Sequence, residues 1–207
     1  MQFTGFTPEQ FAVFEREGFT DRMLGIRTLV RPALQALGQD LAPHLESLAG
    51  HPLYPHVALH ARRRVNPPDD TWVAFGRSER GYKAYAHFAV GIGVEGVYVG
   101  LVIKDESDDR ATLGRQLAKR PGLGLAACKA LEGYHLAELK GEIPAAATRI
   151  TLRGLADSLV NRKTSTLHLV YPVPRADPRL SDAADVKKLA LELLNPLKCW
   201  YEWSIGG

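Results

Sequence analysis

The residues best suited to chemistry lie in one segment, residues 54–88, which reads YPHVALHARRRVNPPDDTWVAFGRSERGYKAYAHF. Between residues 60 and 87 this segment carries six Lys/Arg against three Asp/Glu, and the resulting charge of +3 equals the formal charge of the whole chain. Guanidinium groups bind phosphate and carboxylate oxygens through paired hydrogen bonds, and histidine exchanges protons near neutral pH. The composition therefore predicts an anion-binding surface in this segment.

The order of residues 54–64 indicates on which face of a strand the cationic side chains lie. Apolar and polar residues alternate here, which is typical of a strand whose successive side chains point to opposite faces. One face then carries Val57, Leu59 and Ala61, and the other carries His56, His60, Arg62 and Arg64. Together with side chains from the adjoining segments, the predicted ligand-binding residues are His60, Arg62, Arg64, Arg80, Lys83 and His87.

A metal site is one alternative, because His56 and His60 have the HxxxH spacing of zinc ligands on a helix. On a helix two such residues lie about 6 Å apart. Four residues of a strand span roughly 13 Å, which is too far for one metal ion to bind both imidazoles. Because the segment is predicted as a strand, the sequence predicts no metal and no cofactor.

A nucleic-acid surface is a second alternative. Tyr82 and Tyr85 lie in a polar connection near the arginines, and aromatic side chains in such positions can stack on bases. Trp72 is expected in the core instead, because the strand TWVAF at residues 71–75 is apolar on both faces. An anionic small molecule and a nucleic acid are therefore both predicted as partners.

The plainest interpretation gives the arginines a structural role. They would pair on a solvated surface with Asp69, Asp70 or Glu79, and each exposed pair contributes about 0 to 1 kcal/mol. The two aspartates follow the sequence NPP at residues 66–68, which is typical of a turn. We therefore expect turn residues at positions 69 and 70 rather than acid–base carboxylates.

Helix signals lie at both ends of the chain. The sequence TPEQ at residues 7–10 predicts a capped helix to about residue 17. A second helix is expected to begin at residues 20–21, and Pro32 and Pro43 should kink or divide it. The dipeptide SD at residues 181–182 predicts the start of a long terminal helix, because both residue types cap helices.

Strand signals are grouped between these helices. Runs rich in β-branched and aromatic residues predict strands at residues 71–75, 87–93, 97–104, 134–139 and 167–173. Further helices are expected at residues 107–117, 122–131 and 151–160. This order predicts an α+β fold, with a curved, mainly antiparallel sheet covered by N-terminal helices and a long C-terminal helix. We expect residues 1–207 to form a single domain.

Composition limits the classes of partner and compartment. The 26 basic and 23 acidic residues are too evenly matched to imply a nucleic-acid or membrane partner for the molecule as a whole. Cys128 and Cys199 fit no metal-ligand or redox spacing, which favours a reduced intracellular protein. The first residues lack a secretory signal pattern, and no run of 18 apolar residues follows. We therefore expect a cytoplasmic protein without a membrane partner.

Three blocks of the sequence carry a family resemblance. The blocks HARRRVNPPDDTWVAF at residues 60–75, RGYK at 80–83 and HF at 87–88 make the chain similar to the YktB-like family of uncharacterised bacterial proteins. The stretch RPALQALG at residues 31–38 fits the same family. The resemblance implies a compact α+β domain, and it implies no catalytic residues because the family has no assigned activity.

Two functions follow as hypotheses. The first is a binding protein that holds an anionic ligand, either a phosphorylated small molecule or a nucleic acid, on the basic surface. The second is an enzyme acting on a phosphorylated or carboxylated substrate, with His60 or His87 as general acid–base. An enzyme requires a deep pocket into which a histidine and at least two arginines converge, whereas a flat basic surface would exclude one.

Overall fold

The computed structural model describes residues 2–137 and 149–207 of the chain. Six strands, counted over these residues, form one antiparallel sheet in the order β1-β2-β3-β4-β6-β5. Their bounds are β1 Tyr54–Val57, β2 Asp70–Gly76, β3 His87–Gly93, β4 Gly96–Ile103, β5 His135–Ala137 and β6 Leu167–Pro174. The predicted antiparallel arrangement of the first four strands is confirmed, and β6 adds to it from far along the chain.

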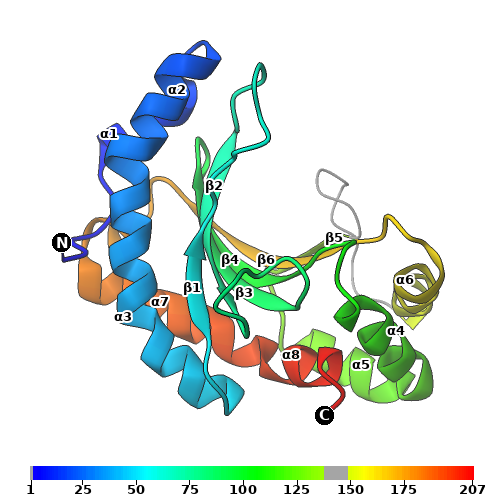
Figure 1. The fold of residues 1–207 in the computed structure, drawn as a ribbon. Coiled ribbons are helices and arrows are strands. Elements are labelled where there is room, and N and C mark those ends of the chain that lie inside the picture. Colours follow the sequence, from blue (N-terminus) through cyan, green and yellow to red (C-terminus); the bar gives the residue numbers. More distant parts are fainter. Residues whose placement is uncertain (1, 138–148) are drawn as a thin grey trace.

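The helices precede, interrupt and follow the strands. The described α-helices are α1 Pro8–Ala12, α2 Phe19–Gly25, α3 Arg31–Ala49, α4 Asp109–Lys119, α5 Pro121–Lys129, α6 Arg149–Asn161, α7 Ala183–Leu194 and α8 Lys198–Ser204. Figure 1 shows α3, α7 and α8 on one side of the curved sheet, whereas α4, α5 and α6 lie beyond its β5 end. None of the helices in the described part is long and apolar enough to cross a bilayer.

The helix predicted to about residue 17 begins where expected, but α1 ends at Ala12 and only a 3-10 turn follows at Val13–Glu15, so the predicted end is wrong. The side-chain oxygen of Gln10 accepts a hydrogen bond of 3.1 Å from the backbone N–H of Thr7 at the start of α1. Pro32 lies in the first turn of α3, directly after a π-helical turn at Ile26–Val30 that joins α2 to α3 without a break, so it does not divide the predicted helix. Pro43 lies inside α3 and does not end it.

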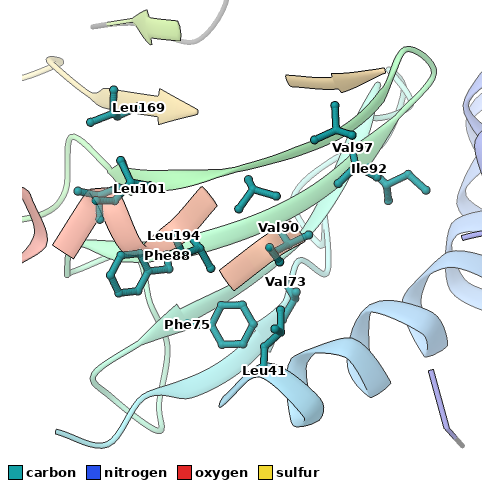
Figure 2. Close-up of a cluster of buried hydrophobic side chains, with 14 of the residues drawn as sticks. Leu41, Val73, Phe75, Phe88, Val90, Ile92, Val97, Leu101, Leu169 and Leu194 are labelled. Atoms are coloured by element: carbon teal, nitrogen blue, oxygen red, sulfur yellow. The ribbon is translucent and has the colours of Figure 1, made fainter. Parts of the chain in front are cut away.

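The core lies between the sheet and the helices on one side of it. Figure 2 shows alternate residues of β2 and β3, among them Val73, Phe75, Phe88 and Val90, packed with Leu41 of α3 and Leu194 of α7. The ring of Tyr201 from α8 stacks on Phe88 at a centroid distance of 4.8 Å. The predicted α+β fold, with an antiparallel sheet covered by N-terminal and C-terminal helices, is therefore confirmed.

The other face of the sheet carries small residues and a few large polar side chains. The ring of Tyr98 lies across Gly91, because a Cβ atom built on Gly91 would be 2.0 Å from Cζ of the tyrosine. The Tyr98 hydroxyl donates a hydrogen bond of 3.1 Å to the carboxylate of Asp70, so the ring is fixed over two neighbouring strands. Burial and the nearby Asp70 carboxylate raise the pKa of Tyr98 well above its usual value.

Replacement of Gly91 by alanine is expected to lower the free energy of unfolding by about 1–3 kcal/mol, because the new methyl group displaces the Tyr98 ring. The matched control is Gly122→Ala in α5, where an added Cβ meets nothing within 4 Å. Alanine there should raise stability by up to about 1 kcal/mol through helix propensity. Urea denaturation of both variants tests this, and equal midpoints would contradict it.

One predicted strand is wrong. The alternating segment 54–64 was expected to be extended throughout, but β1 ends at Val57 and a turn follows at residues 61–62. His60 has a positive φ of 51°, a left-handed conformation that no strand contains. Arg62 and Arg64 therefore do not share a strand face.

The other predicted elements agree with the structure or differ from it by a few residues. Asp182 caps α7 as predicted, since its carboxylate accepts hydrogen bonds of 2.8 and 3.0 Å from the N–H groups of Ala184 and Asp185. The strand predicted at residues 134–139 is β5 at His135–Ala137, and positions 138–139 lie outside the described residues. The helix predicted from residue 151 already begins at Arg149.

Candidate functional site

Two connections of the sheet enclose a pocket of about 830 Å³. One connection joins β1 to β2 through residues 58–69, and the other joins β2 to β3 through residues 77–86. The pocket volume falls within the range of about 300–1,000 Å³ that is usual for small-molecule sites. The predicted basic segment therefore forms a concave surface rather than a flat one.

The structure brings together four of the six predicted site residues. His60 and Arg62 line the pocket from the first connection, and Arg80 and Lys83 line it from the second. Arg64 is absent from the lining, because its Nη1 atom donates to the carbonyl oxygen of Ala61 at 2.6 Å instead. The positive φ of His60 and the turn after it cause this separation.

The charge of the lining is one-sided. Its cations are Arg62, Arg63, Arg80 and Lys83, and none of the described lining residues is an aspartate or a glutamate. Arg62 makes no ion pair with any residue of ranges 2–137 and 149–207, and Lys83 is 3.8 Å from the exposed carboxylate of Glu106. The lining of the pocket therefore carries a net positive charge.

Aromatic rings form the floor between these cations. The His60 ring meets Trp72 edge-on at a centroid distance of 5.5 Å, and its Nε2 atom is 3.0 Å from Oγ1 of Thr71. Trp72 is half-buried and lines the pocket, so the expectation that it belongs to the core is wrong. Its side chain points to the face opposite Val73, where α3, α7 and α8 do not pack. The floor offers flat apolar surface beside the cations.

His56 also lines the pocket, from β1. Its Nε2 atom is 2.8 Å from the carbonyl oxygen of Ser78, and its ring lies 6.0 Å from the ring of Tyr82. Because a carbonyl only accepts hydrogen bonds, Nε2 of His56 carries a proton. Across the described ranges, no group of three or more His, Cys, Asp or Glu side chains could hold a metal ion.

His87, the sixth predicted residue, lies beneath the pocket rather than in its lining. Tyr82 covers it with an edge-on contact of 4.8 Å between ring centroids. The Nδ1 atom is 2.9 Å from the carbonyl oxygen of Tyr85, so Nδ1 donates and Nε2 is unprotonated. Burial, together with the nearby cationic Lys104, lowers the pKa of His87 from 6.5 to about 3. His87 is therefore neutral at physiological pH and unsuited to exchange protons there.

A buried ion pair anchors the second connection. The guanidinium of Arg77 makes two hydrogen bonds of 2.8 and 2.9 Å with the carboxylate of Asp109 at the start of α4. The same carboxylate accepts a hydrogen bond of 2.7 Å from the backbone N–H of Ala86, and Arg77 stacks over the ring of Tyr85 at 4.2 Å. Both ends of the connection are thus fixed on one carboxylate, which positions Arg80 and Lys83.

Two polar residues on the same sheet face were missed by sequence reasoning. The Nζ atom of Lys104 is 3.4 Å from Nε2 of His168 and 5.6 Å from the ring centroid of Trp72. His168 lies on β6 in line with Val102 of β4 and His87 of β3. The pairing of β4 with β6 brings these residues together, and no spacing in the sequence indicates that pairing.

These features define a class of protein: an α+β fold with a single antiparallel sheet, helices on one face and a cationic pocket at the β1 edge. The chain belongs to the family described as "Domain of unknown function (DUF1054)", whose model matches residues 6–201. The predicted resemblance to the YktB-like family is confirmed, and it extends into the second half of the chain.

Several relatives carry the name UPF0637 protein. One from Bacillus velezensis is 46% identical over 112 residues, which are 54% of this chain and 53% of the relative. One from Bacillus licheniformis is 45% identical over 114 residues, 55% and 54% of the two chains. One from Staphylococcus aureus is 42% identical over 115 residues, 56% of each. The chain spans about half the length of the curated relatives it matches.

Proposed function

We propose that this protein binds an anionic small molecule, such as a phosphorylated metabolite, in the pocket between the β1–β2 and β2–β3 connections. The observation that carries the proposal is the convergence of Arg62, Arg63, Arg80 and Lys83 from two separate connections on one pocket. No carboxylate of the described lining neutralises them. Guanidinium and ammonium groups in such a setting select phosphate or carboxylate oxygens.

The shape of the pocket supports a small ligand over a nucleic acid. Surfaces for single-stranded nucleic acid follow the backbone along a groove and offer exposed rings for successive bases. Here Tyr82 is buried and packs on His87, and Trp72 meets His60 edge-on. The rings therefore shape one concave site beside the cations, and the site is large enough for a single small molecule.

Isothermal titration calorimetry with inorganic pyrophosphate tests the proposal. Arg62→Gln and Arg80→Gln should each lower the affinity by about 10- to 100-fold, because each removes a charge-assisted hydrogen bond of about 1.5–3 kcal/mol. Arg64→Gln is the matched control, since Arg64 belongs to the same connection but not to the lining. The affinity of Arg64→Gln for pyrophosphate should stay within about threefold of that of the original chain, because only the long-range attraction of the Arg64 charge is lost.

Three results would contradict the proposal. The original chain could fail to bind pyrophosphate, or Arg64→Gln could weaken binding as much as Arg62→Gln does. A single-stranded oligonucleotide could also bind more tightly than pyrophosphate, with an affinity that falls steeply as salt is raised. That last result would favour the nucleic-acid alternative.

A further inference from the structure

Helices α4, α5 and α6 lie together beyond the β5 end of the sheet (Figure 1). A second hollow lies where these helices meet. Helices α4 and α6 cross closely at Gly114, since a Cβ atom there would lie 2.8 Å from the carbonyl oxygen of Ala156. Pro121 begins α5 and turns the chain away from α4. A groove of about 600 Å³ lies between these helices.

The floor of this α4–α6 groove is apolar. Leu117 of α4 and Leu152 and Ala156 of α6 are buried residues that line it. Val160 also lines the groove and keeps 37% of its surface exposed. The uncovered apolar surface of the groove therefore comes from Ala118 and Val160, which line it and are exposed.

The rim of the groove is cationic. Arg115 and Arg153 line it, and both are exposed. Arg115 donates to the uncharged hydroxyl of Thr112 at 3.2 Å, and neither arginine forms an ion pair within the described ranges. The one carboxylate of the described lining, Asp157, accepts a hydrogen bond of 2.7 Å from the amide of Asn161. Two guanidinium groups are thus available beside an apolar floor.

We propose that the α4–α6 groove binds an amphiphilic carboxylate, with its alkyl chain on Ala118 and Val160 and its carboxylate between Arg115 and Arg153. An inorganic anion would leave the apolar floor in water, and an uncharged alkane would leave the guanidinium groups without an anionic partner. A medium-length alkyl carboxylate satisfies both parts of the site. The proposal is independent of anion binding in the pocket between the two connections.

Calorimetric titration with hexanoate, octanoate and decanoate, each below its micelle-forming concentration, tests the site. Binding should be saturable with one ligand per chain, and the affinity should rise about fourfold for each added methylene. Arg153→Gln should weaken decanoate binding about tenfold and leave the weaker binding of decanol unchanged, because only the carboxylate contacts the guanidinium. Equal loss for both ligands would overturn the assignment of the carboxylate to this rim.

Ala118→Trp provides a blocking variant, because Ala118 is exposed and lines the groove without belonging to the core. Decanoate binding should be lost, whereas far-UV circular dichroism, the unfolding midpoint and pyrophosphate affinity stay unchanged. Undiminished decanoate binding by this variant, or no saturable binding by the original chain, would overturn the proposal. A change of oligomeric state on Ala118→Trp, seen by sedimentation, would show that a second copy covers the groove and would also overturn it.

Discussion

Replacement of Asp109 by alanine is expected to lower the free energy of unfolding by about 3–5 kcal/mol, because it leaves the charge of Arg77 without its partner in a largely buried position. The Arg77 side chain is 29% exposed and that of Asp109 is 8% exposed, so solvent screens the pair only weakly. The substitution also removes the acceptor for the N–H of Ala86. Urea denaturation measures the loss directly.

The matched control is Asp108→Ala, one residue earlier. Asp108 is exposed and its side chain makes no capping hydrogen bond to α4, so its removal should change the unfolding free energy by less than about 0.5 kcal/mol. At a temperature at which the Asp109→Ala variant is still folded, the affinity of this variant for pyrophosphate should also fall. Arg80 and Lys83 would no longer be held in position by the ion pair. Equal stability of the two variants would refute the anchoring role of the ion pair.

The second large effect concerns the pH dependence of stability through His87. Burial lowers the pKa of His87 from 6.5 to about 3 in the folded chain. The unfolded chain takes up this proton near pH 6.5, and the folded chain resists it until about pH 3. The contribution of His87 is therefore fully present above pH 6.5 and is lost as the pH falls toward 3, by about 5 kcal/mol in total.

His87→Gln isolates this contribution, because glutamine does not titrate and the carboxylates of both proteins stay the same. Between pH 6 and pH 4 the original chain should lose about 1.4 kcal/mol per pH unit more than the variant does. Urea denaturation at pH 7, 6, 5 and 4 gives both profiles. Parallel profiles for the two proteins would mean that His87 is not buried in its neutral form.

Local signals in the sequence account for most of the elements. The apolar runs at residues 71–75 and 87–93 predict β2 and β3, and Asp182 predicts the start of α7. These predictions succeed because capping and alternation depend on neighbours within a few residues. The antiparallel sheet and its helical cover follow from the order of the elements alone.

The site depends on features that are not local, and sequence reasoning predicts it less well. Alternation predicts a strand through Arg64, but the left-handed conformation of His60 ends it and turns Arg64 away from the pocket. Trp72 has apolar neighbours in the sequence, yet α3, α7 and α8 cover the sheet face opposite to its side chain. The Lys104–His168 contact requires the pairing of β4 with β6. No residue type in either strand indicates that pairing.

The most direct test of the pocket is anomalous diffraction from crystals soaked in selenate, an analogue of sulfate whose position is unambiguous. Anion binding by the pocket predicts a selenium peak between Arg62 and Arg80, at a position from which the selenate oxygens reach hydrogen-bond distance of both guanidinium groups. The Arg62→Gln crystal should lack the peak, and the Arg64→Gln crystal should retain it. Selenate ordered elsewhere on the protein, with none in the pocket, would contradict the central claim.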